Sequence, residues 1–154
     1  MSQGPTDSDP TPIRFRFAVR AVLVQLGAIQ TLLGLYALFI PVSFYEDFPF
    51  GRGWVEALPA YNEHLVRDVG GLFLGTGFLL IAAGYWMERR WIGVALVSFL
   101  LFSVPHTVWH LFNLEPYSTG DAIGNAVTLT ATVLLPLWAL WATFSARGSG
   151  RGAD

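Results

Sequence analysis

Residues 65–112 read LVRDVGGLFLGTGFLLIAAGYWMERRWIGVALVSFLLFSVPHTVWHLF, two long apolar runs separated by the charged turn Glu88-Arg89-Arg90. An α-helix of about 20 apolar residues crosses the roughly 30 Å hydrocarbon core of a bilayer. Within that core the backbone must pair all of its N–H and C=O groups internally, which a helix does. The stretch therefore predicts a hairpin of two membrane-crossing helices.

Two more apolar runs flank this hairpin in the sequence. We expect four spans, at about 18–40, 65–87, 91–112 and 122–144, with a long loop at 41–64. The predicted fold class is all-α, a four-transmembrane-helix bundle over residues 18–144. The polar ends, 1–17 and 145–154, have the composition of disordered tails.

Composition agrees with a membrane location. Hydrophobic residues make up 53% of the chain and charged residues 13%, whereas soluble domains carry about 25% charged residues. The net charge of −2 gives no field that would attract nucleic acid, so the lipid bilayer is the expected partner. The absence of cysteine excludes disulfides and thiolate metal sites within the chain.

Arginine distribution predicts the orientation, because cytoplasmic loops are enriched in Lys and Arg. The opposite loops hold only Arg52 and Arg67. The flanks on the side of the termini hold Arg14, Arg16, Arg20, Arg89, Arg90, Arg147 and Arg151. We therefore expect a multi-pass protein of the plasma membrane with both termini in the cytoplasm.

The outer loop, 41–64, is rich in proline and aromatic residues. Pro41, Pro49 and Pro59 exclude a single helix over this range, although a short interfacial helix around Trp54–Leu58 fits the pattern. The loop is either a lid over an outer site or a connector that rests on the lipid headgroups, and the second interpretation is favoured.

Glycines at intervals of seven residues mark where helices approach closely. They fall at Gly27 and Gly34 on the first span and at Gly70, Gly77 and Gly84 on the second. Small residues let membrane helices pack at short distance, so we expect the first two spans to pack on each other. Gly71 and Gly75 form a GxxxG motif, which offers a homodimer or another membrane protein as partner.

Polar residues gather where the last three spans reach the outer surface. His64 and Asp68 lie on one face of the second span, together with Gly71 and Gly75. The corresponding faces of the third and fourth spans carry Ser103, His106, His110 and Asn113, and Asp121, Asn125, Thr128 and Thr132. The topology predicts that these faces meet at one depth, next to a bend at Pro105.

This pattern predicts a pocket that binds a metal or a cofactor. The candidate binding residues are His64, Asp68, His106, His110, Asn113 and Asn125, supported by Glu63, Arg67 and Asp121. Pairs at i and i+4 on two helices, His64 with Asp68 and His106 with His110, suit a divalent transition metal such as Zn²⁺, Cu²⁺ or Fe²⁺. Facing histidines would also suit haem, and a histidine near a carboxylate would suit proton or quinone chemistry.

A structural interpretation has similar weight. Near the membrane surface His, Asn and Asp are inexpensive, and the same residues would form a hydrogen-bonded plug that fixes helix register. The chain would then be a non-catalytic or accessory subunit of a membrane complex. No nucleotide-binding, hydrolase or metalloprotease motif occurs in the sequence, which weighs against an enzyme. An enzyme that acts on a lipid-soluble substrate stays open as a third option.

The stretch RDVGGLFLGTG, residues 67–77, follows a first span that ends at Pro41 and an aromatic loop. This arrangement resembles small bacterial four-helix membrane proteins of unknown function that are loosely DoxX-like. The resemblance covers roughly residues 18–144 and implies an accessory redox role, but it assigns no catalytic residue. The use of arginine without lysine is similar to that of a high-GC actinobacterium.

Overall fold

The computed structural model describes residues 13–58 and 60–145, and these form five helices. The helices are α1 (Arg16–Phe39), α2 (Pro41–Asp47), α3 (Glu63–Trp86), α4 (Arg89–Leu111) and α5 (Thr119–Phe144). All but α2 are long and apolar enough to cross a membrane. The expectation of an all-α fold with four helices of membrane-crossing length is therefore confirmed. The tails at 1–12 and 146–154 lie outside the described residues.

Each long helix overlaps one expected span and begins slightly before it. Arg16 and Phe17, expected in the N-terminal tail, belong to α1. Side-chain caps explain two of the starts, because Asn62 accepts a hydrogen bond from the Leu65 amide and Ser118 accepts one from the Asp121 amide. The turn between α3 and α4 is short and places Met87 in the left-handed region.

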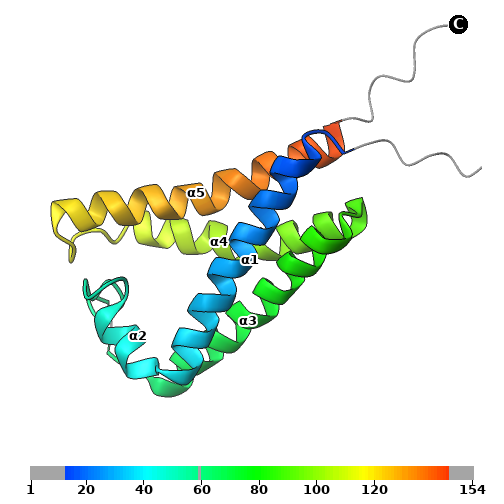
Figure 1. The fold of residues 1–154 in the computed structure, drawn as a ribbon. Helices are drawn as coiled ribbons and strands as arrows, with labels where there is room; N and C mark the ends of the chain where they lie inside the picture. The colour runs from blue at the N-terminus through cyan, green and yellow to red at the C-terminus, as the bar shows by residue number, and fades with distance from the viewer. Residues whose placement is uncertain (1–12, 59, 146–154) are drawn as a thin grey trace, which may run out of the picture.

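The long helices are arranged as two pairs, with α1 packed chiefly on α3 and α4 chiefly on α5 (Figure 1). We call the side of the molecule that holds the described chain ends and the α3–α4 turn the terminal end. All four long helices meet there (Figure 1). Toward residues 40–62 and 112–118, which we call the loop end, the two pairs diverge (Figure 1).

The main cluster of buried apolar residues lies in the terminal half of the molecule. It combines the first half of α1, the second half of α3, the first half of α4 and the second half of α5, through Val19, Leu23, Leu26, Leu80, Ala83, Met87, Ile92, Ala95, Leu96, Phe99, Ala139 and Ala142. Outside this core most of the apolar surface of the four helices is exposed, as a lipid-facing surface would be.

Glycine holds the α1/α3 pair together, as expected. A Cβ atom built on Gly70 would lie 2.7 Å from the Leu38 amide nitrogen, and one on Gly77 would lie 2.9 Å from the Thr31 amide nitrogen. Both neighbours are backbone atoms that cannot move aside, so only glycine permits this approach. By contrast, nothing lies within 4 Å of a Cβ built on Gly71 or Gly75.

The outer loop contains a helix, but not where the sequence suggested one. The helix is α2, and Pro41 begins it, a position where proline's missing N–H is no loss. The prediction of a short helix around Trp54–Leu58 is wrong, because this stretch forms turns. Helix α2 is fixed to α1 by the Tyr36 hydroxyl, which lies 2.8 Å from the Ser43 hydroxyl, and by an edge-on contact between Tyr36 and Phe44.

Candidate functional site: the polar seam between α4 and α5

Four buried polar side chains lie where α4 meets α5 in the loop half, and we call them the α4–α5 seam: Ser103, Thr107 and His110 on α4 and Asn125 on α5. Positions 103, 107 and 110 follow helical spacing and share one face. The Thr107 hydroxyl donates to the Leu129 carbonyl at 3.2 Å, a bond that fixes how the two antiparallel helices are aligned.

Three buried atoms of the seam have no hydrogen-bond partner among the described residues: Ser103 Oγ, His110 Nδ1 and Asn125 Oδ1. The alignment at Thr107 and Leu129 sets the depth of each group. His110 lies one turn from Thr107 toward the loop end and Asn125 one turn from Leu129 in the same direction, so both are at one level. Ser103 lies two turns deeper than His110, about 10 Å along the helix.

Aromatic rings surround the two histidines of α4. The rings of His106 and His110 are 4.5 Å apart at an angle of 64°, and Trp109 packs edge-on against His110 at 5.2 Å. His106 stacks on Phe102, which contacts Phe73 of α3. His110 is 9% exposed and faces the seam, whereas His106 is half-buried toward α3.

The outer loop closes the loop end of the seam. The Trp54 indole donates to Asp121 Oδ1 at 2.9 Å, and Arg52 forms an ion pair with the same oxygen at 2.6 Å. The Trp54 ring packs over Gly124, where an added Cβ would lie 3.3 Å from the ring. Because Gly124 precedes Asn125 in α5, Trp54 covers the helix turn that presents the buried amide.

A second contact holds this segment of the loop. The Tyr117 hydroxyl donates to the Trp54 carbonyl at 2.8 Å, and burial raises the pKa of Tyr117 above its ordinary value. The Ser118 hydroxyl donates to the second carboxylate oxygen of Asp121 at 2.7 Å. Asp121 is therefore the central acceptor that links the loop to α5.

The residues expected on the second span do not join the seam. His64 and Asp68 pair with each other on α3 at 3.2 Å, and their side chains are 87% and 57% exposed. The expectation that three helices direct polar faces into one pocket is therefore wrong for α3, because the α1/α3 pair diverges from α4 and α5 at this end. Glu63 pairs with Arg67 at 2.8 Å, and Arg67 also donates to the Leu38 carbonyl.

The expected four-ligand metal site is not assembled. Within residues 13–58 and 60–145, no three or more His, Asp or Glu side chains are grouped closely enough to hold a metal ion. The predicted ligands instead form two separate pairs, His64 with Asp68 and His106 with His110.

Three other polar residues of the predicted pocket bond to a backbone carbonyl of the nearest helix in sequence, α4 for Asn113 and α5 for Thr128 and Thr132. The Asn113 amide donates to the Trp109 carbonyl at 2.7 Å. Thr128 donates to the Gly124 carbonyl and Thr132 to the Leu129 carbonyl, both at 2.7 Å. Such local bonds satisfy a hydroxyl without a partner helix, so these side chains do not require a ligand.

Sequence reasoning missed Thr107, Arg52 and Trp54. Thr107 follows Ser103 by four residues and precedes His110 by three, a spacing that places it on the same face. No comparable signal marks Arg52 or Trp54, because their contacts with Asp121 join residues 69 and 67 positions apart.

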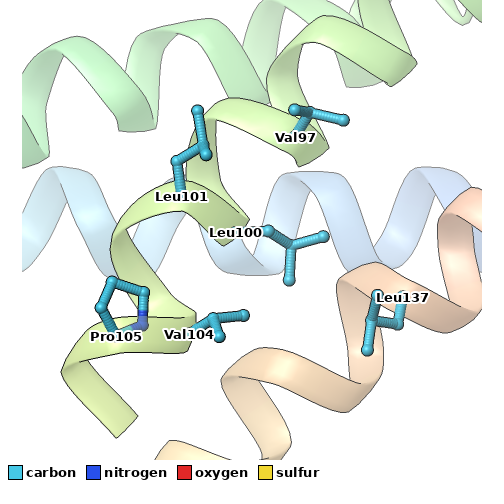
Figure 2. A pocket seen from close by; sticks show the side chains of 6 residues that line it. All are labelled: Val97, Leu100, Leu101, Val104, Pro105 and Leu137. Atoms are coloured by element: carbon cyan, nitrogen blue, oxygen red, sulfur yellow. The ribbon is translucent and has the colours of Figure 1, made fainter. Parts of the chain in front are cut away.

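An apolar groove of about 540 Å³ runs along the same helix pair on the side away from α3 (Figure 2). It lies beside Pro105, and aliphatic side chains from α4 and α5 form the rest of its wall: Val97, Leu100, Leu101, Val104 and Leu137. With no polar side chain it offers no catalytic or ligating group of its own.

Comparison of the chain with protein-family models, curated proteins and solved structures found no match. The DoxX-like resemblance accordingly stays a prediction, and the geometry of the seam is the basis for the function proposed below.

Proposed function

We propose that this chain is a multi-pass protein of the plasma membrane and that its α4–α5 seam binds a lipid-soluble molecule that carries a hydroxyl group. The observation that supports the proposal most directly is the pair of buried, unpartnered atoms at one level, His110 Nδ1 and Asn125 Oδ1. A buried polar atom without a partner costs about 1–3 kcal/mol. A plug that served only to fix helix register would be expected to pair its own groups.

The chemistry of the two atoms defines the ligand class. Asn125 Oδ1 accepts hydrogen bonds only, and the imidazole Nδ1 of His110 donates when it carries the proton. A single hydroxyl group placed between them would satisfy both, because it can donate to the amide oxygen and accept from the imidazole. An alcohol or a phenol dissolved in the membrane therefore fits the site, and a water molecule is its simplest competitor.

The outer loop would serve as the lid of this site. Asn125 lies next to Gly124, which the Trp54 ring covers, and both Asn125 and His110 are buried. A ligand would therefore enter from the loop end when the segment held by Asp121 moves. This favours the lid over the headgroup-resting connector, since Arg52 and Trp54 direct polar groups to α5 and not to the bilayer surface.

The test compares an alkylphenol with the alkylbenzene of equal chain length as probes. We expect the alkylphenol to raise the melting temperature of the purified protein more than the alkylbenzene does. Asn125→Leu should remove this difference, whereas Thr128→Val, which alters an exposed hydroxyl of the same helix, should keep it. Equal stabilisation of wild type by both probes would contradict the proposal.

The redox role implied by the DoxX-like resemblance is compatible with a phenolic ligand. It requires a partner protein that supplies or accepts electrons. The competing proposal is a non-catalytic accessory subunit whose polar groups only hold helices together. Its best support is the Thr107–Leu129 bond, a helix-to-helix contact of that kind. Loss of stability in Asn125→Leu without any effect on ligand binding would favour it.

We propose that both termini lie in the cytoplasm. The terminal end carries Arg14, Arg16, Arg20, Arg89 and Arg90 among the described residues, whereas the arginines of the loop end, Arg52 and Arg67, pair with acids. Because the chain lacks cysteine, single-cysteine variants give clean labelling. A membrane-impermeant maleimide should label Gly51→Cys and not Arg90→Cys in intact cells, and the reverse pattern would overturn the orientation.

A homodimer through Gly71 and Gly75 is the proposal for a protein partner. Support comes from the open space around both residues, which α1 does not use. Crosslinking in membranes should capture a dimer of the wild-type protein, and Gly71→Leu should abolish it. Unchanged crosslinking in the variant would rule out this face.

A further inference from the structure

The terminal end carries a small groove that the seam does not explain. Arg16, Phe17 and Arg20 line it, and its volume is about 270 Å³. Arg16 and Arg20 are four residues apart on α1 and therefore lie on one face of the helix. Neither forms an ion pair with any acid of residues 13–58 or 60–145, so within this part of the chain two positive charges border the groove without a counter-charge.

A contact between helices holds one of the two guanidinium groups in place. Arg20 Nε donates to the Gly84 carbonyl of α3 at 3.1 Å. This bond uses one of the five N–H donors of the side chain and leaves both Nη groups for a ligand. A guanidinium fixed in this way has already lost part of the freedom that binding would otherwise remove.

Phe17 gives the groove an apolar side. Its side chain is 86% exposed although it is one of the largest apolar residues of α1. The position is the first turn of a helix long enough to cross a membrane. In such a helix the first turn would lie at the level where lipid phosphates meet the first acyl carbons. Guanidinium groups bind phosphate oxygens through two parallel hydrogen bonds, and basic residues beside a span attract anionic lipids.

We propose that Arg16 and Arg20 bind the phosphate group of one anionic phospholipid and that Phe17 contacts the upper part of its acyl chains. A free phosphate ion would use the two arginines but not the exposed phenyl ring, so the combination favours a lipid. This site lies at the opposite end of the molecule from the seam and does not depend on the function proposed there.

The experiment is native mass spectrometry of the full chain in detergent, with phosphatidylglycerol and phosphatidylcholine as probes. We expect wild type to retain one phosphatidylglycerol and to bind it at least about tenfold more tightly than phosphatidylcholine, since each basic residue near an anionic surface contributes about 1 kcal/mol. Arg16→Gln/Arg20→Gln removes two such residues and should bind phosphatidylglycerol about thirtyfold more weakly than wild type.

The matched control is Arg14→Gln/Arg90→Gln, which removes the same charge from the same end and leaves the groove intact. It should retain the lipid as wild type does. Equal loss in both double variants would show a diffuse charge effect and overturn the site. Displacement of the lipid by inorganic phosphate at equal concentration would identify a free anion as the ligand and also overturn it. Unchanged circular dichroism and melting of all variants excludes misfolding as the cause.

Discussion

The α1/α3 pair and the α4/α5 pair each join two long helices of opposite direction, yet their contact surfaces are built differently. Glycines bring α1 and α3 into backbone contact, and the approach at Gly70 and Gly77 leaves no space for a side chain. The α4/α5 pair buries Ser103, His110 and Asn125 instead, each with an unpartnered atom, whereas α1 and α3 contribute one such atom, Gln30 Nε2. One pair therefore closes by backbone contact, and the other encloses polar groups with unused hydrogen-bonding capacity. On the function that we propose for the α4–α5 seam, these groups are kept for a ligand at a cost in stability.

The largest expected effect comes from the glycine pair. Gly70→Leu would place a side chain 2.7 Å from the Leu38 amide nitrogen and force α1 away from α3. Overpacking of this kind typically costs 1–3 kcal/mol and occasionally more, so we expect a loss of about 3 kcal/mol in unfolding titrations in mixed micelles. Gly71→Leu, next in sequence but facing open space within the chain, should change the stability of the monomer by less than about 0.5 kcal/mol when both variants are measured at dilutions that keep the protein monomeric. Similar losses of stability in both variants would contradict the conclusion that glycine at position 70 is needed for the contact between α1 and α3.

The second largest effect is expected at the loop segment that covers the α4–α5 seam. Asp121→Ala removes the acceptor for Arg52, Trp54 and Ser118. We expect the loop to detach from α5, with a loss of about 1–2 kcal/mol and faster cleavage of residues 48–58 by added protease. Glu115→Ala, another acid of the loop end, is the control. Protection of the loop in Asp121→Ala at the level of wild type would show that other contacts hold it.

A smaller effect is expected from the one bond that joins the helices of the seam. Thr107→Val keeps the side-chain shape and removes the hydroxyl that donates to the Leu129 carbonyl. Hydrogen bonds between membrane helices contribute about 0.6 kcal/mol on average. The free energy of unfolding should fall by that amount, and Thr132→Val, whose hydroxyl bonds within its own helix, should change it less. A gain in stability for Thr107→Val would show that this hydrogen bond does not fix the alignment of α4 and α5.

The sequence was sufficient to predict the long helices and the α1/α3 contact, because both depend on patterns within a segment. Apolar runs of membrane length and glycines seven residues apart require no knowledge of the rest of the fold. The same reasoning identified His110 and Asn125 as members of a polar group. It failed where the outcome depended on how the helix pairs are placed relative to each other.

His64 and Asp68 illustrate that failure. Their spacing matches that of a pair of metal ligands. A bundle whose four helices stayed together along their whole length would bring them close to His110. The structure turns them outward because α3 follows α1 away from α4 and α5 (Figure 1). The contacts of Arg52 and Trp54 with Asp121 were equally beyond reach, since they join a loop to a helix far along the chain.

The most direct test of the central claim is the free energy of unfolding of Asn125→Leu in delipidated micelles. Asn125 is 2% exposed and its Oδ1 has no partner. If the amide is kept for a ligand, replacing it with an apolar side chain of similar size should leave stability unchanged or raise it by about 1 kcal/mol. A loss of more than about 1 kcal/mol would mean that Asn125 holds the helices together, and the seam would then be a structural network.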